Sequence, residues 1–547
     1  MKYIYLATAI FFSVALSAQQ VPPGYALTQD QISELPLLEL DTFDHDKLLT
    51  EDLSIEAETG RTNFGRRIFM DMDANNCGTW TELPNGARVW RLRFRTAGAL
   101  AVNVYMDDLF LPEGSKLFLY SADQSYFEGP LDHSFNREHG HWAFGEVFGD
   151  EAILEYYEPF GSLGNPHLGI SAFGHFYRYI YDYRAENRGG GSDPCEVDVK
   201  CPEGNAWQAE ADAVVRLTIP DGGFVGLCSA SLVNTTAMDC RNYILSALHC
   251  AENTSDSDLL DTSVRFNYQR SGCGTGSAVS NHNLSGCIRL ADSNDGGGAS
   301  GSDFILLELE SNIPSSWDPF YSGWDASGDG SSSGVSIHHP AGDSKKISTY
   351  GTSLTSVWIG APGSHWQVTW MQTVTNWGVT EGGSSGSPIY NSNHKVVGTL
   401  TGGSSFCNDQ TAPDFYGKMS KHFDSNPNAS NQKLRVWLDP ENTGQNVMFG
   451  AYAPCDQEYV GLLENDIQFE DISVFPSLSD NFITIVTEAY LQIDEVRIFD
   501  ATGKMVRSFG LQGSQTQVDV SALGSGIYYI TFIQNNGSHT TQKISKI

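Results

Sequence analysis

Residues 380–388, TEGGSSGSP, combine a hydroxyl group with the backbone freedom that acyl-transfer chemistry needs. Such chemistry requires a hydroxyl that can attack a carbonyl and N–H donors aimed at the oxygen that becomes negative. Gly383 has no Cβ and Gly386 can adopt a positive φ, so the amides of Gly383 and Ser385 can point the same way. Pro388 then begins an extended segment that would fix the turn against a strand. Taken alone, the stretch is equally compatible with an ordinary Ser/Gly loop.

Two other segments supply the partners that a serine nucleophile requires. Residues 244–250 read as an apolar strand ending at His249, and Asp303 stands at the start of the apolar strand 304–309. The order His, Asp, Ser is that of the chymotrypsin-type proteases. We expect Ser385 to be the nucleophile, His249 the base and then the acid, and Asp303 the group that orients the imidazole. The alternatives are a structural histidine and a turn aspartate, but a buried carboxylate needs a partner.

The composition of the chain suits a soluble, β-rich protein of several domains. Its 547 residues exceed what one core usually holds, so three or so domains are expected. The 55 glycines and 12% aromatic residues are typical of short strands joined by tight turns. The net charge of −34 argues against nucleic acid and anionic membranes as partners, and favours cationic ligands or simple solubility. We expect no nucleic acid partner, no cofactor and a monomer.

Residues 1–18 have the pattern of a secretory signal peptide. Lys2 supplies the positive charge, residues 4–16 the apolar segment, and Ser17 or Ala18 the small residue at the cleavage point. No later segment has enough uninterrupted apolar residues to cross a bilayer. The ten cysteines of an exported chain are therefore expected to form mostly disulfides.

Residues 19–188 are expected to form a β-rich propeptide. Its clearest strand, 88–95, places Arg91, Arg93 and Arg95 on one face. This stripe is either a solvated face or a docking face for the acidic protein that follows.

Turn-rich junctions separate the later units. The segment after Arg188, GGGSDP, is either a linker or an activation cleavage site. Short strands with Gly/Ser/Asn turns between them predict antiparallel barrels in the central unit. We place this unit at residues 189–453, a linker at 454–470 and a last β unit at 471–547.

The central unit resembles the lysyl endopeptidases, bacterial trypsin-fold serine proteases, over about residues 189–453. The resemblance rests on the segments 195–204, 248–250, 302–309, 337–340 and 378–388. It implies a mostly β fold with a chymotrypsin-like double β-barrel. Residues 471–547 resemble the C-terminal sorting domain of type IX secretion. That likeness implies a small β-sandwich, the outer-membrane secretion machinery as a partner, and a location on the cell surface or outside the cell.

The resemblance to lysyl endopeptidases assigns further roles around the three residues. The N–H groups of Gly383 and Ser385 would form the oxyanion hole. Asp414 would lie at the base of the specificity pocket and select a basic side chain, since a buried carboxylate is costly without a cation. Trp370 would stack on the catalytic imidazole. The wall of the pocket would be lined by Thr401, Gly402 and Gly403.

Two departures from the family pattern leave the specificity open. The segment from Cys407 to Asp414 is short, which makes Asp409 a rival for the pocket base, and Thr401 stands where the family often has histidine. Arg188, not a lysine, precedes the presumed activation site. We predict cleavage after basic residues of protein substrates, with Lys preferred and Arg tolerated. The alternatives are a serine protease of another specificity and a catalytically inactive surface adhesin.

The family pattern also implies disulfides, namely Cys195–Cys407, Cys201–Cys273 and Cys228–Cys250. Elimination then pairs Cys240 with Cys287 in the same unit, while Cys77 and Cys455 stay unassigned. We predict no metal cluster. His338 and His339 are expected to be structural, although Asp292 and Asp295 in a glycine-rich loop could hold calcium.

Overall fold

The structure is a computed structural model that describes residues 21–178, 191–278, 281–424 and 429–455. Within 472–546 it describes all residues except 476–477, 480, 488–492, 501–503, 512, 514 and 535–538. The predicted signal peptide, the predicted cleavage site at Arg188 and nearly all of the predicted linker lie outside the described residues. No described helix is long and apolar enough to span a bilayer.

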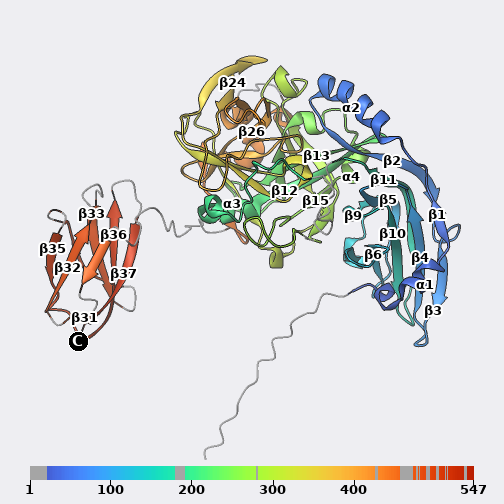
Figure 1. The fold of residues 1–547 in the computed structure, drawn as a ribbon, viewed down its shortest axis with the longest axis horizontal. Coiled ribbons are helices and arrows are strands. Elements are labelled where there is room, and N and C mark those ends of the chain that lie inside the picture. Colours follow the sequence, from blue (N-terminus) through green and yellow to red (C-terminus); the bar gives the residue numbers. More distant parts are fainter. Residues whose placement is uncertain are drawn as a thin grey trace, which may run out of the picture.

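The N-terminal unit (residues 21–178) is a sandwich of two β-sheets, as expected for a β-rich segment (Figure 1). Alternating apolar side chains face inward from both sheets, and the rings of Phe94 and Phe173 meet between them with centroids 4.7 Å apart. One sheet contains β1 (Leu37–Glu39), β3 (Thr79–Glu82), β4 (Arg88–Arg95), β10 (Glu151–Glu158), β6 (Lys116–Ser121) and β7 (Phe127–Leu131). The other contains β2 (Asn63–Met72), β11 (His167–Phe176), β5 (Ala101–Phe110), β8 (Trp142–Ala143) and β9 (Val147–Phe148).

The arginine stripe of β4 lies inside this unit and faces carboxylates on its neighbouring strands. Arg91 Nε donates to Glu155 at 2.6 Å, Arg93 Nε to Glu151 at 2.7 Å, and Arg95 pairs with Glu39. The docking face for the central unit is therefore wrong, and a solvated face describes only Arg95, whose side chain is 39% exposed. The stripe forms cross-strand ion pairs, which stabilise a sheet when opposite charges face each other.

Two helices belong to the N-terminal unit, α1 (Gln29–Ser33) and α2 (His45–Thr59). The Asp44 carboxylate caps the start of α2 by accepting the Lys47 N–H, and Gly60, at φ 70°, ends it in a left-handed conformation. Because β2 begins only three residues after Gly60, the short segment 60–62 is held between a helix end and a strand.

The first barrel of the central unit (residues 191–455) carries the histidine and the aspartate. Its strands lie in the order β16-β15-β12-β13-β14-β18-β17, and every pair is antiparallel. Strand β13 pairs with β14 only at Ser231 and Leu232. The strands are β12 (Val214–Asp221), β13 (Phe224–Leu232), β14 (Tyr243–Ser246), β15 (Ser263–Arg265), β16 (Asn283–Ser285), β17 (Cys287–Asp292) and β18 (Ile305–Leu309).

The second barrel carries the serine turn in front of β25. Its strands lie in the order β22-β21-β25-β26-β27-β24-β23, with β20 (Gly323–Asp325) added beside β26. They are β21 (Gly334–His338), β22 (Lys346–Tyr350), β23 (Thr355–Ile359), β24 (Ala361–Val368), β25 (Pro388–Asn391), β26 (Lys395–Gly403) and β27 (Asp414–Lys418). Of the remaining short strands, β19 (Phe320–Tyr321) pairs with β29 (Ala451–Tyr452), and β28 (Val447–Met448) pairs with β20. The central helices are α3 (Gln208–Ala213), α4 (Asp256–Leu260), α5 (Met419–Asp424) and α6 (Arg435–Leu438).

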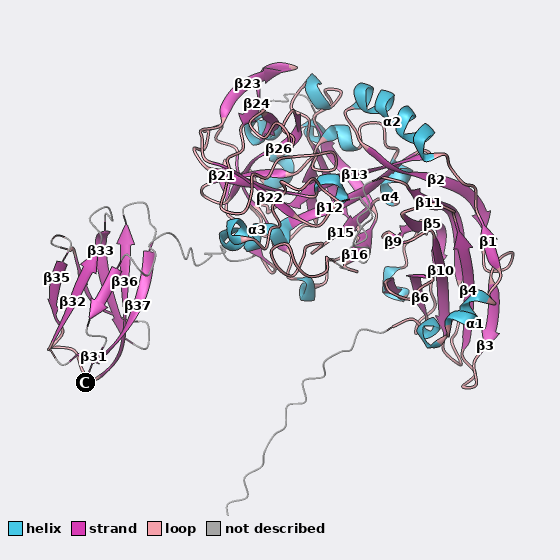
Figure 2. Cartoon of the chain, in the orientation of Figure 1, coloured by secondary structure: helices cyan, strands magenta, loops and turns pink. Residues whose placement is uncertain are grey.

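The C-terminal unit has two small sheets around one apolar core, which includes Ile483, Ile485, Val496, Ile498 and Ile530. One sheet contains β30 (Ile472–Phe475), β32 (Phe482–Thr487) and β35 (Gln515–Asp519). The other contains β31 (Leu478–Ser479), β37 (His539–Lys546), β36 (Gly526–Gln534), β33 (Ile493–Asp500) and β34 (Met505–Phe509). Strands dominate all three units (Figure 2), so the predicted mostly β class is confirmed.

Candidate active site

His249 and Asp303 come from paired elements of the first barrel. His249 lies in the 3-10 turn Leu248–Cys250 directly after β14, and Asp303 lies shortly before β18, which pairs with β14. The backbone N–H of His249 donates to Asp303 Oδ1 at 2.9 Å, and the ring Nδ1 lies 2.8 Å from Oδ2. Both oxygens of the carboxylate therefore hold the histidine, one through its backbone and one through its ring.

A glycine-rich loop positions this pair. Asp303 has a φ of 59°, which is costly for a residue with a Cβ. Asp295 Oδ2 accepts the N–H of Ser302 at 2.6 Å and so restrains the backbone next to Asp303. A Cβ on Gly297 would lie 3.0 Å from the backbone nitrogen of His249, so the loop packs on the histidine only because residue 297 is glycine.

The two buried groups shift each other's pKa. Burial alone would lower the pKa of His249, but the charge of Asp303 and its hydrogen bond outweigh burial and raise it above the ordinary value. Burial would raise the pKa of Asp303, but the His249 imidazolium, with its ring and backbone hydrogen bonds, lowers it. The pair therefore stabilises a protonated imidazole beside a charged carboxylate.

The serine turn leaves two backbone donors free. Gly383 and Gly386 have φ values of 97° and 78°, as their lack of a Cβ permits. Among the described residues, neither the N–H of Gly383 nor that of Ser385 donates a hydrogen bond. Buried or half-buried N–H groups are rarely left without an acceptor, so this pair of donors is suited to bind an oxyanion.

Ser229 of β13 fixes the turn against the first barrel. Its N–H donates to the carbonyl of Ser385 at 2.8 Å, and its hydroxyl donates to the carbonyl of Gly383 at 2.9 Å. A Cβ on Gly386 would lie 2.8 Å from the nitrogen of Ala247, two residues before His249. The sequence analysis missed Ser229, because nothing in an alternating strand marks which hydroxyl meets another barrel.

The structure brings the serine turn next to the histidine but shows no hydrogen bond between Ser385 Oγ and His249 Nε2. Ser385 is half-buried. The Nε2 atom is buried and has no hydrogen-bond partner among the described residues. Catalytic hydrogen bonds are often long or absent in unliganded enzymes and tighten when substrate binds. The unpartnered Nε2 is therefore available as a proton acceptor.

Asp414 lies buried at the start of β27, beside the end of β26 that carries Thr401, Gly402 and Gly403. Its carboxylate accepts hydrogen bonds from Trp370 Nε1 at 2.7 Å, Thr380 Oγ1 at 2.8 Å and Ser405 Oγ at 2.6 Å. Burial raises its pKa, and these hydrogen bonds lower it by less. No described cation forms an ion pair with it. Its rival Asp409 lies on an exposed turn, where it exchanges backbone hydrogen bonds with Phe406.

The expected stack of Trp370 on the His249 imidazole is wrong. The indole instead donates to Asp414, and its ring packs edge to face on Tyr416 with centroids 6.2 Å apart. Thr401, at the place of the family histidine, lies 3.0 Å from His365 Nε2 through its hydroxyl. Trp370 thus contributes to the polar surroundings of Asp414.

Four disulfides join eight of the ten cysteines, and one bond differs from the expectation. Cys195–Cys407, Cys201–Cys273 and Cys228–Cys250 are present as predicted. The expected Cys240–Cys287 bond is wrong, because Cys240 pairs with Cys455 across 215 residues. Cys287 and Cys77 are free thiols. Elimination failed because the true partner of Cys240 lies beyond the predicted end of the central unit.

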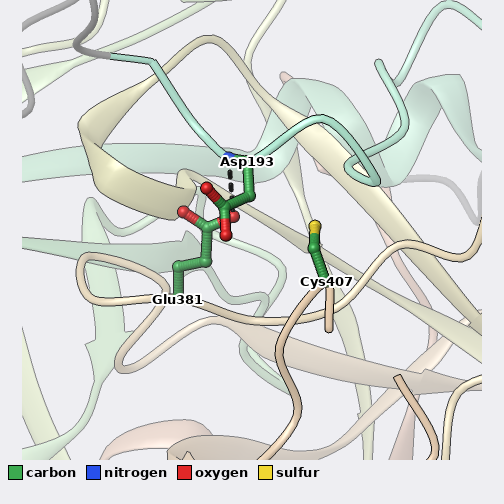
Figure 3. Close-up of side chains that lie close together, drawn as sticks. All are labelled: Asp193, Glu381 and Cys407. Carbon is green, nitrogen blue, oxygen red and sulfur yellow. Dashed lines mark hydrogen bonds between the residues drawn. The ribbon is translucent and has the colours of Figure 1, made fainter. Parts of the chain in front are cut away.

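Figure 3 shows three potential metal ligands, Asp193, Glu381 and Cys407, within 4.8 Å of one another. The Cys407 sulfur is bonded to Cys195, so it offers no thiolate. The calcium alternative is also unsupported, since Asp292 pairs with Arg289 at 3.1 Å and Asp295 accepts hydrogen bonds from its own loop. The two neighbouring histidines are held by structural hydrogen bonds, His338 to Ser384 and Ser348, and His339 to the carbonyl of Asp343.

A segment of the N-terminal unit contacts both the serine turn and the first barrel. The hydroxyl of Thr62 would be 2.6 Å from a Cβ on Gly382, next to the turn's free donors. Arg61, with 8% of its side chain exposed, donates to Asp221 at 2.9 Å, and its charge lowers the pKa of His249. No sequence signal marks these residues, because they act through a contact between two units that are distant in the sequence.

The chain matches known families over its central and C-terminal units. Residues 189–417 match the family described as Lysyl endopeptidase, C-terminal domain, and residues 473–546 match the Secretion system C-terminal sorting domain. A lysyl endopeptidase from Pseudomonas aeruginosa strain PAO1 is 28% identical over 371 residues, which cover 63% of this chain and 77% of that protein. These findings confirm both predicted resemblances and the expected export to the cell surface or the medium.

Solved structures show a weaker likeness. An HtrA-type protease with a tripeptide is 13% identical, covers 39% of this chain, and has a TM-score of 0.26; the match spans 58% of that chain. A Glu endopeptidase is 18% identical and covers 38% of this chain and 85% of its own, with a TM-score of 0.25. Scores this low carry no weight for the assignment.

Proposed function

We propose that this chain, a serine endopeptidase with a lysyl endopeptidase C-terminal domain, cleaves peptide bonds after basic residues through His249, Asp303 and Ser385. The observation that carries the proposal is the pair of hydrogen bonds between His249 and the Asp303 carboxylate. The serine turn beside them has two N–H donors that make no hydrogen bond among the described residues. Each of the three groups has a role that its surroundings support.

In the proposed reaction, Ser385 Oγ attacks the carbonyl carbon while His249 Nε2 removes its proton. The negative charge that develops on the carbonyl oxygen is stabilised by the N–H groups of Gly383 and Ser385, each worth about 3 kcal/mol. Asp303 stabilises the imidazolium, which then protonates the leaving amine. The resulting acyl-enzyme is hydrolysed by water, with His249 again acting as the base.

Asp414 is proposed to bind the basic side chain of the residue before the cleaved bond. Its buried carboxylate has only neutral hydrogen-bond donors around it among the described residues, so a substrate cation would supply the missing charge. A Cβ on Gly403 would lie 1.8 Å from Asp414 Oδ1, so the glycine keeps this oxygen open. An ammonium group is compact enough for such a site, and we propose that lysine is preferred and arginine tolerated.

The N-terminal unit is proposed to be an inhibitory propeptide. Thr62 and Arg61 lie in the cleft where substrate must bind, and β2 pairs with β13 beside it. Removal of this unit, after Arg188 or nearby, would open the cleft. The sorting domain is proposed to engage the outer-membrane secretion machinery.

A two-part experiment tests this function. A fluorophosphonate probe should label Ser385 in the activated enzyme and fail to label the Ser385→Ala variant, which separates an enzyme from an inactive adhesin. Digestion of a denatured protein mixture, followed by sequencing of the new termini, should then show cuts after lysine and, less often, arginine. Cuts after other residues would favour a protease of different specificity.

A further inference from the structure

One edge of β13 binds a strand that does not belong to the barrel. Strand β14 pairs with β13 only at Ser231 and Leu232, while the stretch from Phe224 to Gly226 pairs with β2 of the N-terminal unit. Once that unit leaves, these backbone groups of β13 lose their partner. An unpaired strand edge beside an active site can bind an extended peptide by adding it to the sheet.

The geometry of the reaction fixes which half of a substrate would reach this edge. The residue before the cleaved bond points to Asp414 in the second barrel, according to the proposed function. The leaving amine must lie next to His249, which gives it a proton, and His249 belongs to the first barrel. The residues after the cleaved bond therefore continue past His249 towards β13, which the Cys228–Cys250 disulfide joins to the histidine turn.

The segment of the N-terminal unit beside this edge shows which kind of side chain the site binds. Arg61 lies against Gly226, with its Nε 3.1 Å from a Cβ placed there, and its guanidinium donates to Asp221 at 2.9 Å. Asp221 ends β12 and keeps 27% of its side chain exposed even beneath Arg61. In the part of the structure that is described, Arg61 is the cation paired with Asp221, so its departure leaves the carboxylate free.

We propose that Asp221 selects a basic side chain in the leaving-group half of a protein substrate that lies along the β13 edge. Arg61 of the N-terminal unit occupies this subsite in the precursor. The inference rests on the proposed function, because it uses the roles of His249 and Asp414 to orient the substrate. It adds a second acid-lined subsite on the opposite side of the cleaved bond.

The test uses activated enzyme prepared from the full chain. Quenched fluorescent peptides carry one lysine and, at each of the three following positions in turn, arginine, alanine or glutamate. A lysine anilide, which has no residue after the cleaved bond, measures the active enzyme in each preparation. The quantity compared is the ratio of kcat/KM for the arginine peptide to that for the glutamate peptide.

We expect the wild-type ratio to exceed 1 at one position and to fall about two- to fivefold in Asp221→Asn, as for loss of a partly exposed ion pair. Asp256→Asn removes the same charge from an exposed residue of the same barrel and should leave the ratio unchanged. Equal ratios in the wild type and in Asp221→Asn would overturn the subsite while leaving the proposed function intact. Failure of the wild type to hydrolyse both the anilide and the peptides would overturn both.

Discussion

The carboxyl groups of Glu196 and Glu381 lie close together, and each acts on the other's ionisation. Glu381 precedes Ser385 by four residues. Glu381 also accepts the N–H of Asp193 at 2.9 Å (Figure 3), and its own N–H donates to Ser384 at 3.1 Å. Burial and the charge of Glu381 raise the pKa of Glu196 well above its ordinary value. Burial raises the pKa of Glu381 to about 7. One proton therefore has to stay with the pair near neutral pH.

This pair should make the folded enzyme less stable as the pH rises. A carboxyl group whose pKa rises on folding gives stability that is full below its unfolded pKa, about 4.5, and lost as the pH approaches about 7. Glu196→Gln can donate a hydrogen bond to Glu381 at any pH. We expect it to reduce the difference in the free energy of unfolding between pH 5 and pH 8 by about 1–2 kcal/mol. Urea denaturation at pH 5 and pH 8 measures it. Glu441→Gln, at an exposed residue, is the control. If the unfolding free energy of Glu196→Gln changed with pH as much as that of the wild type, the coupling of Glu196 with Glu381 would be contradicted.

Asp303→Asn should keep the fold and lose most of the activity. The change removes the charge that stabilises the imidazolium, and the expected fall in kcat is roughly 10³- to 10⁴-fold. Because Asp303 raises the pKa of His249 above 6.5, the acid limb of the wild-type kcat/KM profile should lie above that value. The limb reflects protonation of the base, so activity falls as the pH decreases through it. If the acid limb of the kcat/KM profile lay at the same pH in Asp303→Asn as in the wild type, the pairing of Asp303 with His249 would be contradicted.

Asp414→Asn should abolish the preference for basic residues. Loss of one partner from a buried charge pair costs about 2–5 kcal/mol, which corresponds to a fall of roughly 30-fold or more in kcat/KM for a lysine substrate. Asp409→Asn, on its exposed turn, should have no such effect. Anilides of lysine, arginine and leucine measure the change. If Asp409→Asn instead lost the preference, the pocket would be built on the other aspartate.

The Cys240–Cys455 disulfide should stabilise the central unit. It closes a loop of 215 residues, so the chain-entropy estimate for its removal is about 5 kcal/mol, at the upper end of measured effects. The double variant Cys240→Ser with Cys455→Ser should therefore show a markedly lower Tm than wild type. Thiol titration of the unreduced, denatured chain should find two free groups, from Cys77 and Cys287. Peptide mapping that found Cys240 joined to Cys287 would contradict the structure.

Much of the site could be predicted because its residues sit at strand ends, where local sequence is informative. An apolar run ending in His249 and another beginning after Asp303 predict two neighbouring strands, and the structure pairs them as β14 and β18. The glycines of the serine turn predict positive φ, and both Gly383 and Gly386 have it. These signals are local. The order of the three segments along the chain predicted the roles of His249, Asp303 and Ser385.

Contacts between distant segments could not be predicted in the same way. The arginines of β4 read as a stripe, but only the sheet order shows that Glu155 and Glu151 face them. Trp370 could be placed near the site by resemblance, yet its hydrogen bond to Asp414 depends on the pairing of β24 with β27. The position of Thr62 beside the serine turn depends on the pairing of β2 with β13, which joins two units distant in the sequence.

The N-terminal unit should owe much of its affinity for the central unit to a buried ionic contact that lies apart from Thr62 and Arg61. Glu146 of this unit pairs with Arg216 and, at 3.1 Å, with Arg265 of the first barrel. Burial would raise the pKa of Glu146, but the two guanidinium groups outweigh it and lower the pKa to about 2. The contact is therefore complete above the unfolded pKa of about 4.5 and is lost as the pH falls towards 2.

We expect Glu146→Gln to weaken inhibition by the separately added N-terminal unit by roughly 100-fold or more, since it leaves the buried Arg216 without its charge partner and takes one of two carboxylates from Arg265, which keeps Glu128. The inhibition constant for anilide hydrolysis at pH 8 measures the effect. Asp108→Asn, an exposed change on the same unit, is the matched control and should inhibit as the wild type does. If Glu146→Gln inhibited equally well while Arg61→Ala did not, inhibition would depend on the cleft segment, and the ionic contact would serve only to join the two units during folding.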